Sequence, residues 1–258
     1  MIISPLPIEI VGGGLAGLSL GLALRQAGVS VTLSEAGEYP RHRVCGEFIA
    51  GLAPDTIARL GLAPHLADAL HHHEVAWFLD QTETPARIQR LPSPALGLSR
   101  YVLDARLAAA FVAAGGDLRP RTRITDLTPK PGRIFATGRR RSGAGASWLG
   151  LKIHAHDFTL IRDLELHLGD DAYIGLSRVE GGAVNICGLF RRRDLCAKGS
   201  NLLLGYLQAA GLSRLARRLA DAHLEAASFC AVAAVSFDRR VLPADRVYLG
   251  DACAMIPP

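Results

Sequence analysis

The amino-acid sequence predicts an α/β fold in which a parallel sheet with covering helices is interrupted by an inserted antiparallel sheet. Three observations carry this prediction. A glycine-rich turn stands between a strand pattern and a helix pattern near the N-terminus. Short segments with alternating apolar residues fill much of the stretch from 147 to 235. A last strand pattern then runs into Gly250 and Asp251, as a return to the first sheet would.

The N-terminal stretch is predicted to form a strand, a helix and a second strand. The first strand is the apolar run that begins at Ile8 and ends at Gly12. The helix is expected over 15–27, where leucines recur at helical spacing, and Gly28 stops it. The second strand is expected over 29–34, which is alternating and rich in β-branched residues. This order is that of a βαβ unit.

The turn of this unit has the spacing G-x-G-x-x-G at Gly12, Gly14 and Gly17. The first glycine permits the tight turn, the second lets backbone approach a pyrophosphate, and the third lets the helix lie close to the sheet. Glu35 follows at the end of the second strand, where a carboxylate can accept both ribose hydroxyls. With no basic residue beside Glu35, a free ribose 2′-OH is favoured over a 2′-phosphate. FAD and NAD both fit at this point.

Composition restricts the remaining possibilities. The chain has 258 residues, is 49% hydrophobic and carries a formal charge of +5, with a mean hydropathy of +0.21. The charge comes mainly from arginine in short runs without interleaved aromatic residues, so no nucleic-acid surface is expected. Five cysteines without a C-x-x-C pair favour a reducing compartment, and a cytoplasmic location is expected. The apolar stretch 8–24 contains Glu9 and is better explained by the βαβ unit than by a membrane span.

The rest of the chain is assigned by hydrophobic period and by breaker residues. A proline-broken loop is expected over 91–98, and a loop rich in Arg, Gly and Ser over 139–147 is the clearest boundary. The three consecutive histidines at 71–73 point in diverging directions on any regular element, so no metal site is expected there. Helices are expected at 54–60, 65–70, 101–114, 201–210 and 213–223, and strands at 74–79, 87–91, 123–127, 133–136, 148–156, 164–168, 172–179, 183–190, 229–235 and 246–249.

Together these features resemble one family. The fingerprint, Glu35, the strand end at 136–138, the inserted sheet and Gly250-Asp251 are similar to FAD-dependent oxidoreductases of the para-hydroxybenzoate hydroxylase fold. That family includes aromatic monooxygenases, flavin-dependent halogenases and geranylgeranyl reductases. The resemblance implies FAD as the tightly held cofactor, with Asp251 on its ribityl chain, and NAD(P)H as a transient reductant.

The resemblance also divides the chain. Residues 1–146 are expected to form a Rossmann-like FAD-binding domain, with 74–98 contributing to the substrate domain. Residues 147–235 are expected to form that substrate domain, and 236–258 to return to the FAD-binding domain. The family continues beyond the end of this sequence into a turn and helix that face the flavin, so a truncated C-terminus is expected, and with it weaker FAD binding.

Within the family, the stretch Val44-Cys45-Gly46-Glu47 looks most like the geranylgeranyl reductase branch. There a Cys-Gly segment lies beside the flavin, which implies contact of Cys45 with flavin or substrate, and Cys45 is the candidate catalytic residue. Arg43 and Arg100 match positions near the FAD phosphates, a task that suits a planar, permanently charged guanidinium. The candidate cofactor-binding residues are Gly12, Gly14, Leu15, Ala16, Gly17, Glu35, Ala36, Arg43, Arg100, Ile124, Gly250 and Asp251.

The expected function is therefore a FAD-dependent oxidoreductase acting on a small apolar substrate of isoprenoid, polyketide or aromatic type. It would reduce a double bond, or hydroxylate through a flavin hydroperoxide. The aromatic motifs of reductases and halogenases are missing from the stretch 173–178, and no lysine precedes Lys130 to serve as the halogenase lysine. No general base stands out. The alternative is a truncated, catalytically inert relative that binds nucleotide. Association with a membrane surface stays open, as does the oligomeric state.

Overall fold

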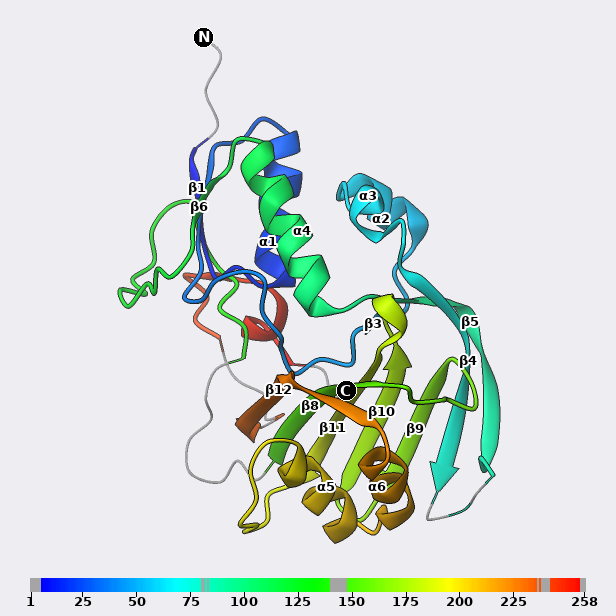
Figure 1. Cartoon of the computed structure of the whole chain (residues 1–258). Coiled ribbons are helices and arrows are strands. Elements are labelled where there is room, and N and C mark those ends of the chain that lie inside the picture. Colours follow the sequence, from blue (N-terminus) through cyan, green and yellow to red (C-terminus); the bar gives the residue numbers. More distant parts are fainter. Residues whose placement is uncertain are drawn as a thin grey trace.

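Two sheets organise the chain, one above the other in Figure 1, and the described segments cross between them several times. The computed structural model describes residues 6–79, 82, 84–139, 148–235, 237 and 242–255. Within these residues one sheet has five strands and the other has eight. The predicted boundary loop lies outside the described residues from 140 to 147.

The five-stranded sheet is parallel, as predicted, and has the order β13-β7-β1-β2-β6. Helices α1 and α4 run side by side along it in Figure 1, next to the sheet in the upper part of the molecule. The described elements of this part are β1 (Ile8–Val11), α1 (Leu15–Gln26), β2 (Val31–Ser34), α4 (Arg100–Ala113), β6 (Asp117–Arg119), β7 (Arg133–Phe135), β13 (Val247–Tyr248) and the short 3-10 turn η2 (Gly250–Ala252).

Helix α1 packs by its small and apolar face. Its buried residues include Leu18 and Leu22, which recur every four positions, and Gly21 lies against the ring of Phe111 on α4. A Cβ added at Gly21 would come within 3.0 Å of that ring, so the glycine sets how closely the two helices approach. The βαβ prediction is thereby confirmed in its order and its bounds, within two residues at each end.

The eight-stranded sheet is mixed, with the order β12-β8-β11-β10-β9-β4-β5-β3. The inserted segment supplies antiparallel strands as expected, but β4 and β9 pair in parallel, a contact between distant stretches that no local pattern encodes. The strands are β3 (Phe48–Ile49), β4 (Leu70–Leu79), β5 (Arg87–Gly97), β8 (Trp148–His156), β9 (Leu164–Gly169), β10 (Ala172–Arg178), β11 (Val184–Arg191) and β12 (His223–Val235), with a 3-10 turn η1 (Glu180–Gly182) between β10 and β11.

Helices α5 (Ser200–Ala209) and α6 (Ser213–Ala220) cover one face of this sheet, in the lower part of Figure 1. In β8 the covered residues are Leu151, Ile153 and Ala155, which are fully buried in a core with α5 and α6. Since side chains alternate along a strand, Lys152 and His154 point to the opposite face. The far face of the sheet is therefore polar at β8, and it is turned away from the helices.

Two predictions made for the segments 91–98 and 123–127 were wrong. Residues 91–97 belong to β5 and not to a loop, because the register shift between β4 and β5 leaves Pro92 and Pro94 outside the ladder, where their missing N–H groups cost no hydrogen bond. Residues 123–127 form no strand, because Asp126 accepts hydrogen bonds from both the backbone and the hydroxyl of Thr128 and closes a local turn.

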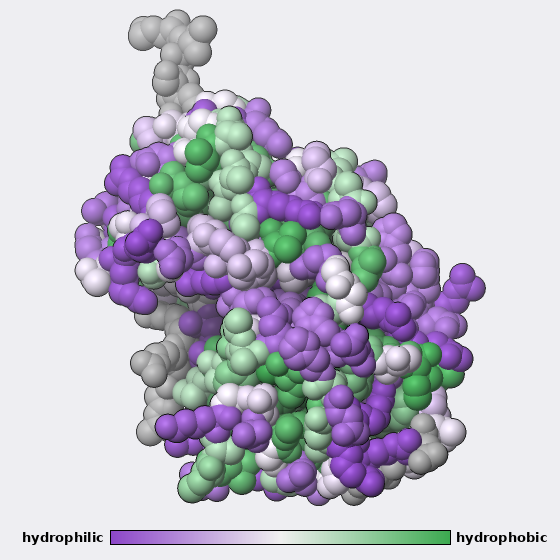
Figure 2. Space-filling view, viewed as in Figure 1, coloured by the Kyte–Doolittle hydropathy of each residue, from purple (hydrophilic) through white to green (hydrophobic). Residues whose placement is uncertain are grey.

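The remaining differences concern element bounds and short strands. Strand β12 begins six residues before the predicted start, and β3 and β6 had no predicted counterpart. The short helices α2 (Pro54–Arg59) and α3 (Ala63–Leu66) stand near their predicted places. Figure 2 shows hydrophobic residues in small groups among hydrophilic ones over this face of the molecule. Among the described helices, none combines the length and the apolar character that crossing a membrane requires.

Candidate functional site

The glycine-rich turn has the close contacts that its spacing predicts. Gly12 has φ +112°, and a Cβ there would lie 2.2 Å from the carbonyl oxygen of Ala136. A Cβ on Gly17 would lie 2.1 Å from the carbonyl oxygen of Gly12. Gly14 differs, since the space beside it is open, and the nearest atom to its added Cβ would be Arg100 Nη2 at 4.0 Å. The turn is therefore closed toward the sheet and open toward Arg100.

The open side is also the N-terminus of α1. The helix starts at Leu15 and Ala16, and its N-cap residue Gly14 provides no side-chain hydrogen bond. The first backbone N–H groups of a helix lack partners within the helix and carry a partial positive charge. An anion such as a diphosphate fits here because backbone can approach it closely and the N–H groups point to it.

Glu35 closes the other side of the turn. One carboxylate oxygen accepts a hydrogen bond from Gly13 N at 2.8 Å, and the other accepts from Gly37 N at 2.8 Å and from Arg41 Nη2 at 2.6 Å. Burial alone would raise the pKa of Glu35, but these hydrogen bonds and the charges of Arg41 and Arg43 bring it below its ordinary value. The carboxylate is thus ionised near neutral pH and retains acceptor capacity for one further donor.

This arrangement corrects one point of the sequence argument. Glu35 does have basic neighbours, because the loop after β2 folds back and brings Arg41 and Arg43 to within 2.6 Å and 3.7 Å of its oxygens. They are six and eight positions away in sequence, so their approach was not visible from adjacency. Ala36, the next predicted cofactor residue, is exposed directly beyond Glu35.

Arg43 and Arg100 share a buried carboxylate. Asp104 of α4 is fully buried and accepts from Arg43 Nε at 3.0 Å and from Arg100 Nε and Nη2 at 2.7 Å and 2.8 Å. Arg43 Nη2 is buried and has no hydrogen-bond partner among the described residues. A buried guanidinium N–H without an acceptor is costly, so this atom is a candidate donor to an anionic ligand.

The C-terminal part of the chain reaches the same place. Gly250 has φ +62°, and a Cβ there would lie 2.9 Å from the Cβ of Ala16 at the start of α1. Asp251 follows in η2 with an exposed side chain. Ile124 is half-buried two residues beyond Thr122, whose N–H donates to Glu35 O at 2.8 Å. The predicted residues from three distant stretches therefore surround one end of the parallel sheet, while their roles stay predictions.

A loop at 42–47 connects this end of the parallel sheet to the open face of the eight-stranded sheet. Cys45 O accepts from Asn185 Nδ2 at 3.0 Å, and Gly46 O accepts from Ser177 Oγ at 2.8 Å. Val44 lies against β8, where a Cβ on Gly150 would come within 3.0 Å of its side chain. Cys45 is half-buried in this loop, between the two sheets.

Glu47 ends the loop in a cluster of charged side chains that the sequence analysis did not find. Its carboxylate is 2.6 Å from His154 Nε2, 3.4 Å from Lys152 Nζ and accepts from Arg100 N at 3.1 Å. Glu47 is buried and has φ +55°, an uncommon conformation for a residue with a side chain. The signal was present in the alternation of β8, which puts Lys152 and His154 on the face opposite its apolar residues.

Lys152 completes the cluster. Its side chain is fully buried, and Nζ lies 3.0 Å from His42 Nδ1. Burial, together with the positive charge of Lys152, lowers the pKa of His42, so the ring is neutral near pH 7 and accepts from the ammonium group. His42, Glu47 and His154 bring ligand atoms within 4.8 Å of one another. The Lys152 ammonium group already balances Glu47 there, and its charge opposes a metal cation.

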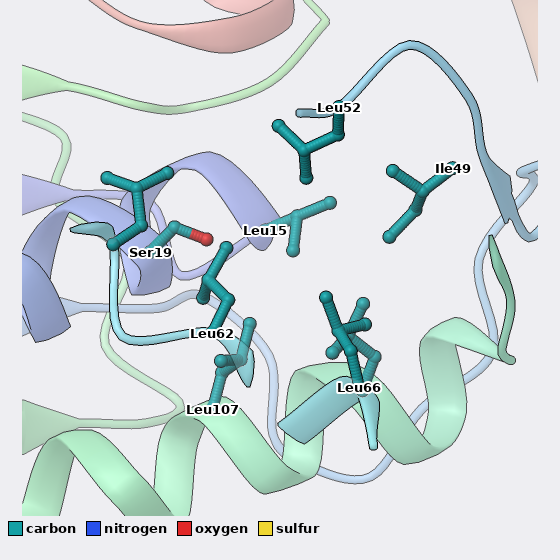
Figure 3. Close-up of a pocket in the computed structure, with 9 residues that line it drawn as sticks. Leu15, Ser19, Ile49, Leu52, Leu62, Leu66 and Leu107 are labelled. Carbon is teal, nitrogen blue, oxygen red and sulfur yellow. The ribbon is translucent and has the colours of Figure 1, made fainter. Parts of the chain in front are cut away.

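An apolar pocket of about 170 Å³ opens near the start of α1 (Figure 3). Leu15, Ile49, Leu52, Leu62 and Leu66 line it together with further leucines at the end of α2 and on α4. Ser19 is the one polar residue in its described lining. The pocket therefore offers apolar contact and no charged group, in contrast to the loop at 42–47.

Comparison with protein families identifies the family to which this chain belongs. The family model described as "FAD binding domain" matches residues 6–145, more than half of the chain. The chain belongs to this FAD-binding family. The match spans the glycine-rich turn, Glu35, both arginines and β7, the parts that the fold brings to one end of the parallel sheet.

Two curated relatives are similar to part of this FAD-binding chain. Menaquinone reductase of Mycolicibacterium smegmatis is 27% identical over 132 residues, which is 50% of this chain and 32% of that protein. Conditioned medium factor receptor 1 of Dictyostelium discoideum is 26% identical over 135 residues, 47% of this chain and 26% of that protein. The matches thus cover at most about a third of the length of either relative.

Solved structures agree in fold. FqzB superposes with a TM-score of 0.74 at 15% identity, over 96% of this chain and 70% of that one. The halogenase PltM gives 0.73 at 14%, over 98% and 64%. A variant of HpxO from Klebsiella pneumoniae, complexed with FAD, gives 0.71 at 17%, over 97% and 75%. The likeness confirms an α/β fold with a Rossmann-like FAD-binding part and a second, mixed sheet.

The residues present fit FAD. The open side of Gly14, the start of α1 and Arg43 Nη2, which lacks an acceptor, suit a diphosphate, and Glu35 retains acceptor capacity for a ribose hydroxyl. Family and geometry therefore agree on FAD as the cofactor.

Proposed function

We propose that this chain is a FAD-dependent oxidoreductase that acts on an apolar isoprenoid, polyketide or aromatic substrate between its two sheets. The observation that carries the proposal is the loop at 42–47. It joins the predicted diphosphate site, through Arg43, to a buried acid–base cluster, through Glu47. A cofactor whose diphosphate is held beside Arg43 would have its reactive end near the acid–base cluster at Glu47.

The roles proposed for the residues follow the layout of the site. Gly12, Gly14 and Gly17 with Arg43 and Arg100 would hold the diphosphate, and Glu35 the adenosine ribose. The remaining contacts would come from Leu15, Ala16, Ala36, Ile124 and Gly250, with Asp251 on the ribityl chain and Cys45 beside the flavin. When bound, the flavin supplies two-electron redox chemistry, and the protein supplies orientation and exclusion of water.

The substrate domain is proposed to comprise 147–235 with 74–98, and the FAD-binding domain 1–146 with 236–258. Reduction of a double bond, as in the geranylgeranyl reductase branch, and hydroxylation with dioxygen are the two candidate reactions. NAD(P)H is the proposed reductant for either one. The curated relative named menaquinone reductase favours a reductase over a hydroxylase by analogy, over the matched half of the chain.

The test is the colour and redox behaviour of the purified chain. A yellow protein whose flavin absorbance is bleached by NADH or NADPH without oxygen is the expected result. Turnover of isoprenoid and aromatic panels with and without oxygen would then separate reductase from monooxygenase. A protein that takes up no flavin from excess FAD would favour the alternative of an inert nucleotide-binding relative.

A further inference from the structure

A row of side chains crosses the open face of the eight-stranded sheet and ends at Lys152. The ladders pair Trp77 with Leu166, Leu166 with Gly175, Gly175 with Cys187, and Cys187 with Lys152. Residues directly opposite each other in neighbouring strands point to the same face. With strands about 4.8 Å apart, the row extends for roughly 19 Å.

The two ends of this row differ in character. Trp77, Leu166, Gly175 and Cys187 are all half-buried, so the row is apolar and partly open. Trp77 Nε1 is buried and has no hydrogen-bond partner among the described residues. At the other end Lys152 is fully buried against Glu47 and His42. An apolar molecule lying along the row would thus reach an ammonium group at one end.

A second row of side chains lies next to the first on the same face of the sheet, and the loop at 42–47 contacts it. His154, Asn185 and Ser177 are also paired across the sheet, two positions along each strand. Asn185 and Ser177 hold the carbonyl groups of Cys45 and Gly46, and His154 holds Glu47. The loop at 42–47 therefore covers the second row and, through His42 and Glu47, the Lys152 end of the first row. The first row stays partly exposed from Gly175 to Trp77.

The cluster also has a path for protons to solvent. His154 Nε2 is 2.6 Å from Glu47, and its Nδ1 is 3.6 Å from Glu225, whose side chain is 39% exposed. Glu47 in turn lies 3.4 Å from Lys152 Nζ. The order Glu225, His154, Glu47, Lys152 leads from the surface to the buried amine.

We propose that Lys152 is the proton donor of this site and that its substrate is an α,β-unsaturated carbonyl compound. The inference rests on the proposed function and chooses among its substrates. An ammonium ion is too weak an acid to protonate an isolated alkene, but it can protonate an enolate, whose basicity is much closer to that of an amine. The acid strength available in the cluster thus selects a conjugated double bond.

The reaction balances with an anionic dihydroflavin, which has already lost one proton, as the reductant. Hydride adds to the β carbon, and the electron pair of the double bond moves to give an enolate. An N–H bond of Lys152 breaks as a C–H bond forms at the α carbon, which leaves a saturated carbonyl compound, an oxidised flavin and a neutral amine. Lys152 regains its proton from solvent through Glu47, His154 and Glu225.

The first test needs neither flavin nor turnover. Lys152→Met removes a charge 3.0 Å from His42 Nδ1, so the pKa of His42 measured by NMR titration should rise. The other groups that face His42 are Tyr101 from α4, whose ring stacks on it, Glu47 from the loop, His154 from β8 and Glu225 from β12, and the substitution leaves all four in place. Lys130→Met, on the surface beside Asp126, is the matched control and should leave His42 unchanged. An unmoved His42 in Lys152→Met would mean that Lys152 carries no charge, and would overturn the proposal.

The second test uses carvone, which has one conjugated and one isolated double bond in the same molecule. The whole chain with FAD and NAD(P)H should give dihydrocarvone with one configuration at the new α centre, and in D₂O with deuterium at that carbon. Lys152→Met should lower the rate about 10²- to 10⁴-fold and mix the configurations, because water then delivers the proton from either side. Lys130→Met should change neither the rate nor the configuration of the product.

Three results of this second test would also overturn the inference. They are saturation of the isolated double bond, an unchanged rate and configuration in Lys152→Met, and no dihydrocarvone from a sample whose flavin is bound and reduced. If the chain binds no FAD, the proposed function itself is wrong, and this outcome is distinct from the three results above.

Discussion

Glu35 holds the backbone of the turn as well as facing the proposed ribose. Its carboxylate accepts from Gly13 N and Gly37 N, and it pairs with Arg41. The side chain is therefore fixed before any ligand arrives, and a ribose hydroxyl would meet an acceptor that needs no rearrangement. Preorganisation of this kind increases affinity because little conformational entropy is lost on binding.

Glu35→Ala is expected to weaken FAD binding by roughly 10- to 100-fold, since a hydrogen bond to a charged group contributes about 1.5–3 kcal/mol. Titration of the apoprotein by flavin fluorescence measures the effect. Glu38→Ala, at an exposed side chain paired with Arg121, is the matched control. Equal affinities for the two variants would remove Glu35 from the cofactor site.

Cys45 lies where the loop meets the open face of the sheet. Cys45→Ser keeps the backbone bond from Asn185 and changes only the side-chain atom, so the fold should be retained. We expect the absorbance maxima of bound flavin to shift, because a hydroxyl replaces a polarisable sulfur beside the ring. The exposed Cys196 provides the control variant Cys196→Ser. Identical flavin spectra for wild type and Cys45→Ser would place the flavin away from this residue.

At the scale of elements, helix α6 is tied to β9 by one buried carboxylate. Glu165 accepts from Arg218 Nη1 at 3.0 Å and from Ile161 N at 2.7 Å, and it lies 2.9 Å from His167 Nε2. Burial alone would raise the pKa of Glu165, but these partners lower it to about 2 from an ordinary value of 4.5. Protonation would thus break the contact between helix and sheet.

The sign of the pH dependence follows from that shift. A carboxylate whose pKa is lower in the folded state stabilises the fold above its unfolded pKa, and the effect is lost as pH falls. Stability should therefore fall between about pH 4.5 and pH 2. Glu165→Gln should cost about 1–3 kcal/mol at neutral pH and flatten this part of the profile, as urea unfolding would measure. Glu74→Gln, in a half-exposed pair with Arg162, is the control, and an equally steep profile in Glu165→Gln would contradict the assignment.

At the scale of the molecule, polar contacts between described residues join the two parts of the fold at several places. The loop at 42–47 is one, through Glu47 and the arginines. Another is Glu180 of η1, which accepts from both the backbone and the hydroxyl of Ser99 at the N-cap of α4. A further contact runs from Arg139 Nη1, beyond β7, to Ala234 O of β12 at 2.9 Å. Because the groups involved are largely buried, separating the sheets would expose charges and leave hydrogen bonds unmade.

We therefore expect the whole chain to unfold in one transition. Both tryptophans, Trp77 and Trp148, lie in the eight-stranded sheet, so their fluorescence reports that sheet alone. Bound flavin reports the parallel sheet. Thermal curves from the two probes should coincide, and FAD at about 100 times its Kd should raise both midpoints by roughly 5–10 °C. Two separate midpoints, with only the flavin signal responding to FAD, would show that the sheets unfold independently.

Much of the fold was predictable because its strongest signals are local. The turn at Gly12 to Gly17 requires glycine at fixed spacing, and strands β8 to β11 place apolar residues at every second position on one face, so period and breakers identified them. One error occurred where strand pairing overrides a local preference, and the other where a local side-chain contact replaces a strand pattern. The prolines of β5 lie in a register shift, and the segment at 123–127 forms a turn through the side chain of Asp126.

The sequence by itself determined the βαβ unit, the return strand at Gly250 and membership of a FAD-binding fold, because each rests on short-range backbone geometry. Only the tertiary structure decided that Arg41 reaches Glu35 and that Lys152, more than a hundred positions from Glu47, meets it in a buried cluster. The pairing of β4 with β9 and the row from Trp77 to Lys152 are decided in the same way. Register across a sheet depends on which strands become neighbours, and that is set by packing of the whole chain rather than by any one segment.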